Sequence, residues 1–356
     1  MDDMLTKAWN EVDRLLRQVD FGALWPGFTA APFALYDGEK ACLDGERMTC
    51  PAAFRGNTAL DWQGRIIAIW RLEPGQGGPV LAADLVHEMF HVFQLQHGEC
   101  RWPDDLAALD APQSPQLLSI KLAENRLLLR AAECSGAETR ALLARVCALR
   151  RWRQMHGSVE FELRAETVEG MAEYMGNEAL CQLDPLAAAQ LRTHRWAAGE
   201  LSPLLLDVRQ QGYLTGPLLL TAAREAHLPF FHTLSGETHH LSSLIAAALE
   251  PLPEAEAVPE HPAAAALVRR RQDARRAQLA EIRARCGAAQ TGCFRICGYD
   301  PVNMWRLGDV FCSTHFWRLY DVQHARTLVF TGECLLYGAD AQHIDAWQSV
   351  CQPEEE

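Results

Sequence analysis

The sequence has no apolar run long enough to span a membrane and no secretory signal pattern at its start. A membrane-spanning helix needs about 18–20 consecutive apolar residues, and no stretch of the 356 residues provides them. The first residues, MDDMLTKAWNEVDRLLRQVD, have acids at once and no apolar core, so they predict an amphipathic helix. We therefore expect a cytoplasmic protein.

Positive charge is also scarce. Lys and Arg number 33 against 46 Asp and Glu, and the formal net charge is −13. This balance argues against wide contact with nucleic acid or an anionic membrane surface, so we expect neither partner. One basic run, residues 268–285, has helical character and few apolar positions. We interpret it as a solvated helix face, with an anion-binding patch as the alternative.

The sequence also lacks internal repeats and long low-complexity tracts. Its 12 cysteines are scattered, and most lie in apolar segments. In a reducing compartment this distribution favours small buried side chains over a disulfide framework. Nothing in the pattern indicates an oligomeric state.

Local patterns predict an α+β protein. Hydrophobic residues make up 49% of the chain, enough for a substantial core. Residues 33–72 contain extended segments, with turn signals at Asp37-Gly38 and Gln63-Gly64. Residues 113–195 show apolar spacing of three to four, which is typical of helices.

A change of composition divides the chain. We expect a mostly helical domain with a small antiparallel sheet over residues 1–250, followed by a Pro- and Glu-rich linker over 251–265. Residues 266–356 predict a small accessory α+β region with about four strands.

One apolar segment, LAADLVHEMFHVFQLQHGEC (81–100), carries polar residues at its centre. On a helix, one stripe contains Asp84, His87, Glu88, His91 and Gln94. Apolar residues cover the rest of the helix, and an unpaired polar group in such a setting costs about 1–3 kcal/mol. A shared metal ion is the simplest partner, and two core histidines with local hydrogen bonds are the alternative.

The spacing of these residues suits a metal. His87 and His91 are one turn apart, so both imidazoles can reach one Zn²⁺, and Glu88 projects beside them as a base for water on the metal. This is the HExxH pattern of zinc metallopeptidases. Zinc held by two histidines needs at least one further protein ligand.

Two parts of the sequence offer that ligand. His97 has the spacing seen in metzincins, but Gln94 stands where those proteins have a glycine that ends the helix. If the helix continues, His97 lies about 240° around the axis from His91. The second source is a helical stripe of four carboxylates: Glu162, Glu166, Glu169 and Glu173. A solvent-exposed helix face would explain this stripe equally without a metal. Gly170, within this stripe, indicates close packing.

The segment VEGMAEYMG (168–176) resembles the EGxAxY helix of gluzincin-type metallopeptidases of the peptidase MA-like superfamily. With the HExxH helix, the resemblance covers about residues 55–220. It implies a zincin-like domain in which Glu169 is the third zinc ligand and Glu173 hydrogen-bonds a zinc-bound histidine. Glu166 is the fallback ligand. The connection between the two motifs is longer than in the most compact members of the superfamily.

The resemblance also implies a function, that of a zinc hydrolase acting on a peptide or protein substrate. Glu88 acts as general base and delivers the proton to the leaving amine. The strand at residues 65–70 is expected at the edge of the cleft, where an extended peptide would pair with it. Tyr213, expected in a Gly-flanked break, is the candidate donor to the oxyanion, and a packing role is its alternative.

Other interpretations remain open at this point. The domain could be a catalytically silent binding or regulatory module, or it could hydrolyse a non-peptide amide or ester. Near the C-terminus, a loose match to a zinc ribbon involves Cys293, Cys297, Cys312 and His315. Burial on strands explains these cysteines equally well, so we assign no chemistry to this region.

Overall fold

The computed structural model describes residues 4–109, 114–198, 201–229 and 234–355, and the chain forms two compact units. The first unit comprises Met1–Pro103 and Leu118–Val258, and the second comprises Asp104–Leu117 and Pro259–Glu356. The helices and separate sheets confirm the α+β class. The division after Val258 falls inside the expected linker, whereas the membership of residues 104–117 in the second unit was not expected.

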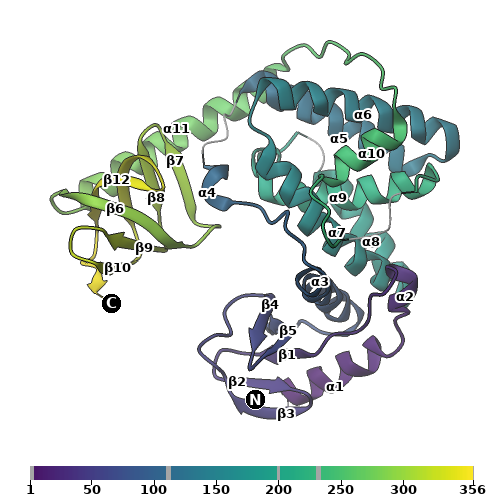
Figure 1. Ribbon diagram of the computed structural model, residues 1–356, viewed down its shortest axis with the longest axis horizontal. Coiled ribbons are helices and arrows are strands. Elements are labelled where there is room, and N and C mark those ends of the chain that lie inside the picture. Colours follow the sequence, from purple (N-terminus) through teal and green to yellow (C-terminus); the bar gives the residue numbers. More distant parts are fainter. Residues whose placement is uncertain (1–3, 110–113, 199–200, 230–233, 356) are drawn as a thin grey trace. The chain divides into compact units, whose positions relative to one another are not determined.

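The first unit consists of a five-stranded sheet and a set of helices (Figure 1). Its helices are α1 (Met4–Leu16), α2 (Phe21–Leu24), α3 (Gly78–Gln96), α5 (Pro115–Glu133), α6 (Gly136–His156), α7 (Glu160–Leu183), α8 (Pro185–Ala198), the 3-10 helix η1 (Pro203–Leu206), α9 (Val208–Glu225) and α10 (Leu241–Leu249). Among the described residues, no helix combines the length and apolar character needed to cross a bilayer.

The strands of this sheet are β1 (Phe33–Tyr36), β2 (Lys40–Leu43), β3 (Glu46–Thr49), β4 (Thr58–Trp62) and β5 (Arg65–Arg71). Their order is β3-β2-β1-β5-β4, and the neighbours pair antiparallel except for the parallel pair β1–β5. Both predicted hairpins are present. Gln63 and Gly64, between β4 and β5, have φ of 53° and 80°, as a tight two-residue hairpin turn requires.

The strand at the edge of the sheet is not the one that the sequence predicts. The sequence placed residues 65–70 at the edge, but β5 is an interior strand and β4 is the edge strand beside it. The reason is visible in the side chains of β5, since Ile67, Ala68 and Ile69 are completely buried and therefore covered on both faces. Each residue of β4, in contrast, retains some exposure.

Helix α3 is buried nearly all round, as its sequence predicts. It packs against β4 and β5, α1 and α7. Its residues from Leu81 to Gln94 are buried apart from Asp84. Pro79 stands in the first turn, and Gly98, with φ of 69°, follows the last turn, so both ends carry the residues that commonly begin and end helices.

Glycines bring three helices into backbone contact. A Cβ placed on Gly170 of α7 would lie 2.6 Å from the Cα of Gly216 on α9, and one on Gly212 would lie 2.9 Å from the backbone of Ala165. A Cβ on Gly176 of α7 would lie 2.9 Å from the Ala83 carbonyl of α3. The predicted close packing at Gly170 is therefore confirmed. The predicted breaks at Gly212 and Gly216 are wrong, because both glycines lie inside α9, where they serve the contact with α7.

A buried group of charged side chains joins α5, α6 and α7. Arg153 donates to Glu124 at 2.6 Å and to Glu162 at 2.9 Å, and Arg150 donates to Glu166 at 2.7 Å. Burial raises the pKa of Glu162. The positive charges of Arg153 and Lys121 have a larger, opposite effect, so the pKa of Glu162 lies well below its ordinary value. Charge is balanced within the group, which consists of Lys121, Glu124, Arg150, Arg153, Glu162 and Glu166.

The second unit is built on one eight-stranded sheet. Its elements are α4 (Asp105–Ala108), α11 (Pro262–Arg285), β6 (Gln290–Tyr299), β7 (Met304–Leu307), β8 (Val310–Ser313), β9 (Phe316–Asp321), β10 (Arg326–Thr331), β11 (Cys334–Asp340), β12 (His343–Ser349) and β13 (Glu354–Glu355). The strand order is β13-β10-β9-β6-β12-β11-β8-β7. The prediction of about four strands was too low. Short strands such as β7 and β8, with four residues each, give little periodic signal.

Replacing Gly170 with alanine tests the backbone contact between α7 and α9. Alanine normally stabilises a helix interior by about 1 kcal/mol relative to glycine, but here the new methyl group meets backbone atoms that cannot move aside. Overpacking of this kind costs about 1–3 kcal/mol, so we expect a lower free energy of unfolding in urea. Gly287→Ala, whose Cβ meets nothing within 4 Å, is the control and should lose no stability.

Replacing Glu162 with glutamine tests the buried charged group. At pH 7 the variant should lose about 3–5 kcal/mol of unfolding free energy, because buried cations lose a carboxylate. The lowered pKa of Glu162 means that its stabilising effect is present above the ordinary value of 4.5 and is lost as the pH falls further. Urea unfolding at a series of pH values should therefore show the two proteins converging below about pH 4.5. A constant difference would contradict this, and the exposed Glu39→Gln serves as control.

Candidate metal centre

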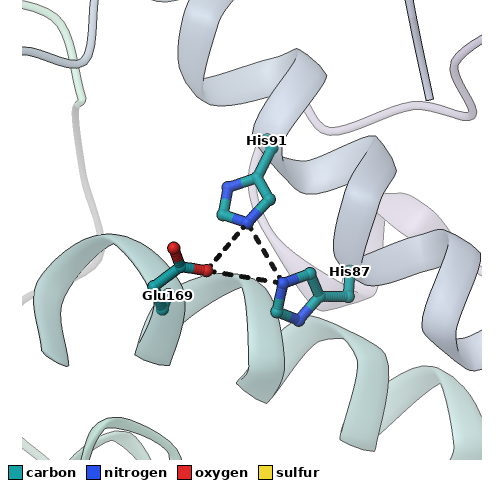
Figure 2. A group of neighbouring side chains, drawn as sticks. All are labelled: His87, His91 and Glu169. Atoms are coloured by element: carbon teal, nitrogen blue, oxygen red, sulfur yellow. Dashed lines mark hydrogen bonds and ion pairs between the residues drawn. The ribbon is translucent and has the colours of Figure 1, made fainter. Parts of the chain in front are cut away.

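Three buried side chains converge between α3 and α7 (Figure 2). His87 and His91 come from one face of α3, and Glu169 comes from the middle of α7. The two Nε2 atoms are 3.1 Å apart, and Glu169 Oε2 lies 3.2 Å from His91 Nε2 and 3.7 Å from His87 Nε2. Each of the three residues has a relative exposure of 8%. The structure thus brings together the two histidines and the first-choice glutamate.

The size of this triangle fits a small metal ion. Two ligand atoms in a tetrahedral zinc site, each about 2.0–2.1 Å from the ion, are separated by about 3.3–3.4 Å. The three observed separations, from 3.1 to 3.7 Å, bracket that value. Two imidazole nitrogens and one carboxylate oxygen are also a common ligand set of catalytic zinc. The residues therefore fit the metal that the sequence implied.

The other ring nitrogens of the histidines are both held by hydrogen bonds. Glu173 Oε2 lies 2.9 Å from His87 Nδ1, and Gln94 Oε1 lies 2.7 Å from His91 Nδ1. An acceptor at each Nδ1 places a proton there and leaves the lone pair of Nε2 directed at the centre of the triangle. Glu173 occupies the place that the resemblance implied.

Gln94 links the two ligand-bearing helices. Besides accepting from His91, its amide donates to the Val168 carbonyl of α7 at 3.1 Å, one residue before Glu169. Its side chain is fully buried. Gln94 lies on the polar stripe predicted for this helix, but its bond to His91 is not predicted from the sequence. Its position one turn beyond His91 was the available signal.

Glu169 is held by α9 through two further contacts. Tyr213 donates its hydroxyl to Glu169 Oε2 at 2.8 Å, and its ring stacks on His87 with centroids 5.8 Å apart. Burial raises the pKa of Tyr213, so the phenol remains a donor. Arg209 donates to Glu169 Oε1 at 3.3 Å and was missed by the sequence analysis. Tyr213 was a predicted site residue, although it lies within helix α9 and not in the predicted break.

Glu88 lies beside the triangle without a fixed partner. Its relative exposure is 6%, and among the described residues no hydrogen bond or ion pair restrains its carboxylate. Burial raises the pKa of Glu88 above its ordinary value, against the opposing charges of His87 and His91. A carboxylate of this kind accepts a proton more readily than one in water.

Electrostatics favour a cation in the triangle. Burial lowers the pKa of His87, but the nearby carboxylates of Glu169 and Glu173 outweigh this effect and leave its pKa well above the ordinary value. Burial raises the pKa of Glu169, but hydrogen bonds with His87 and His91 leave its pKa well below the ordinary value. The carboxylates therefore stabilise positive charge at the imidazoles, and a metal ion supplies such charge equally well.

The remaining candidate ligands lie elsewhere. His97 follows the end of α3, is exposed and bonds the Phe93 carbonyl through Nδ1 at 2.8 Å, so the metzincin alternative is wrong. Glu166, the fallback ligand, instead pairs with Arg150.

The loose zinc-ribbon match does not form a site among the described residues. Cys312 is buried in the second sheet, while Cys293 and Cys297 are exposed on β6, and the three do not gather with His315. All twelve cysteines are free thiols, as expected. Their expected burial holds for only four of them: Cys42, Cys147, Cys312 and Cys334.

Comparison with family models, with curated proteins and with solved structures finds no match for this chain.

Substituting Gln94 with methionine tests whether this amide orients His91. Methionine has a similar volume but cannot accept from His91 or donate to Val168. Loss of such a supporting hydrogen bond typically weakens metal affinity about 10–100-fold, and we expect that range for zinc measured by competition with a chromophoric chelator. Gln96→Met, at an exposed position on the same helix, should bind zinc as tightly as wild type. Equal affinity in Gln94→Met would contradict the assigned role.

Proposed function

We propose that this protein is a zinc-dependent peptidase of the gluzincin type. The observation that carries the proposal is the approach of Glu169 to His87 and His91, which brings two ligand-bearing motifs on separate helices to a single point. Neither motif alone requires the other, and the helical chain between them has to fold back to produce the contact.

The residues of this chain divide the tasks of such a reaction. His87, His91 and Glu169 would hold the metal, with Glu173 and Gln94 fixing the imidazoles. A bound Zn²⁺ would polarise the scissile carbonyl and lower the pKa of a water molecule toward neutrality.

Glu88 is positioned to move the proton. Its carboxylate is unrestrained, nearly buried and adjacent to both histidines. It takes a proton from the attacking water as the water oxygen bonds to the carbonyl carbon, and it returns that proton to the amine nitrogen as the carbon–nitrogen bond breaks. Tyr213, a protonated phenol beside Glu169, is the available donor to the carbonyl oxygen as negative charge develops there.

The edge strand β4 offers a place for an extended substrate. One side of β4 pairs with β5, which lies on α3, and its other side has no strand partner in the described chain. A peptide could therefore extend the sheet through backbone hydrogen bonds, in the manner expected earlier for β5. We accordingly propose a peptide or protein as the substrate.

Glu88→Gln is the direct test. Glutamine keeps the size of the side chain but cannot take a proton, so we expect kcat on a peptide mixture to fall about 10²–10⁴-fold. Zinc content, measured by atomic emission on the purified protein, should stay at one ion per chain because Glu88 is not a ligand. The exposed Glu133→Gln is the control and should behave as wild type.

The outcomes separate the alternatives. Unchanged hydrolysis in Glu88→Gln would overturn the mechanism, and failure of the wild-type protein to take up zinc would overturn the proposed site. Zinc binding without turnover of peptides, amides or esters would indicate a silent binding module. Turnover of esters alone would indicate a non-peptide hydrolase.

A further inference from the structure

The two carboxylate oxygens of Glu169 have different surroundings. Oε2 faces both imidazoles, 3.2 Å from His91 Nε2 and 3.7 Å from His87 Nε2, and it accepts the Tyr213 hydroxyl at 2.8 Å. Figure 2 shows the other oxygen on the side of the carboxylate away from the imidazoles. Among the described residues, the hydrogen bond found for this oxygen, Oε1, comes from Arg209 at 3.3 Å. The carboxylate thus directs one oxygen at the triangle and the other at α9.

Tyr213 cannot hold Glu169 throughout the proposed reaction. An ionised carboxylate only accepts hydrogen bonds, and a phenol has a single proton to donate. In the structure the Tyr213 hydroxyl donates to Glu169. When Tyr213 donates to a substrate oxygen instead, Glu169 loses this bond, and Arg209 is the donor from α9 that still holds it.

Arg209 is suited to this task by its position. It lies one helical turn before Tyr213 on α9, so the two side chains extend from the same face of that helix. The Arg209 side chain is 26% exposed and the Glu169 side chain is 11% exposed, so Arg209 reaches inward from the surface to a buried carboxylate. A guanidinium group keeps its charge over the whole working pH range, so its bond to a carboxylate persists.

The charges of the centre also favour a cation at this place. Three carboxylates act on the imidazole of His87, those of Glu88, Glu169 and Glu173. A zinc ion supplies two positive charges, and Arg209 supplies a third. Without Arg209, these carboxylates would carry one negative charge more than the metal neutralises.

We propose that Arg209 is a positioning residue of the metal centre: it holds Oε1 of Glu169 away from the metal and keeps Glu169 in place while Tyr213 donates to the substrate. Glu169 is then a ligand through Oε2 alone, which leaves the fourth position of a tetrahedral ion to water. A carboxylate that binds through both oxygens would occupy a further position. The inference rests on the metal site of the proposed function and states how its third ligand is controlled.

The visible spectrum of bound Co²⁺ tests the one-oxygen ligand independently of peptidase activity. The full chain is loaded with Co²⁺, which absorbs strongly with four ligands and weakly when a fifth is added. We expect a strong spectrum for wild type and for Arg209→Lys, because an ammonium group keeps the charge and can make the single bond to Oε1. Arg209→Met releases Oε1 and should give a weaker, shifted spectrum. Identical spectra for wild type and Arg209→Met would overturn the inference.

Zinc affinities, measured by competition with a chromophoric chelator, test the shared hold on Glu169. Tyr213→Phe should weaken binding by no more than about threefold, because Arg209 still holds the carboxylate. Arg209→Met should weaken it about 10–100-fold, as loss of a hydrogen bond to a ligand typically does. The double variant should lose more than the product of the two single losses, because both donors from α9 are then absent. A double-variant loss equal to that product would contradict the shared role, as would a loss of about tenfold in Tyr213→Phe alone.

Arg224→Met is the matched control. Arg224 also lies on α9 and also bonds a carboxylate of α7, that of Glu178 at 2.7 Å, but Glu178 is not among the candidate ligands. This variant should match wild type in both measurements. Arg209→Ala, which also releases Oε1, replaces Arg209→Met if that variant does not fold.

The outcomes distinguish this inference from the proposed function. Wild-type metal binding that the Arg209 variants leave unchanged in spectrum and affinity would remove only the role of Arg209. Failure of the wild-type chain to bind either metal would overturn the metal site itself, and this inference with it.

Discussion

The contact of α7 with α3 and α9 through glycine controls the geometry of the candidate site. At Gly176 the backbone of α7 meets the Ala83 carbonyl, four residues before His87, and at Gly170 it meets α9. Glu169 is the neighbour of Gly170, so its short side chain spans the remaining distance to the imidazoles of α3. A methyl group at either contact would lie within 2.9 Å of backbone atoms of the facing helix, so the helices would have to move apart.

The acidic stripe of α7 contains carboxylates with two different structural roles. Glu162 and Glu166, in its first half, meet cations from α5 and α6 and hold the helices together. Glu169 and Glu173, in the second half, meet the imidazoles of α3. All four lie on one face of the helix, and what distinguishes them is the neighbouring helix at each level. Because Glu162 and Glu166 are paired with arginines, Glu169 and Glu173 are the carboxylates of the stripe that remain available to a metal site.

The sequence predicted most of the residues at the centre because their arrangement is local. The spacing of His87 and His91 follows from the helix period alone, and the EGxAxY pattern distinguished Glu169 from Glu166. The roles of Gln94 and Arg209 depend on which carbonyl or carboxylate a neighbouring helix places beside them. A single sequence does not show which helices are neighbours. Strand order is equally non-local, which explains why the edge was assigned to β5 and not β4. Tyr213 does lie beside Glu169, but inside helix α9 and not in the predicted break.

The segment containing α4 leaves the first unit between α3 and α5 and packs in the second. Leu106 and Leu109 lie against the core of the eight-stranded sheet, whose strands begin only at Gln290. During synthesis these leucines emerge long before the surface that covers them. The ribosome therefore has to complete nearly the whole chain before the early segment can dock, and a fragment that stops at Val258 keeps both leucines uncovered. One cut in the gene therefore does not separate the two units.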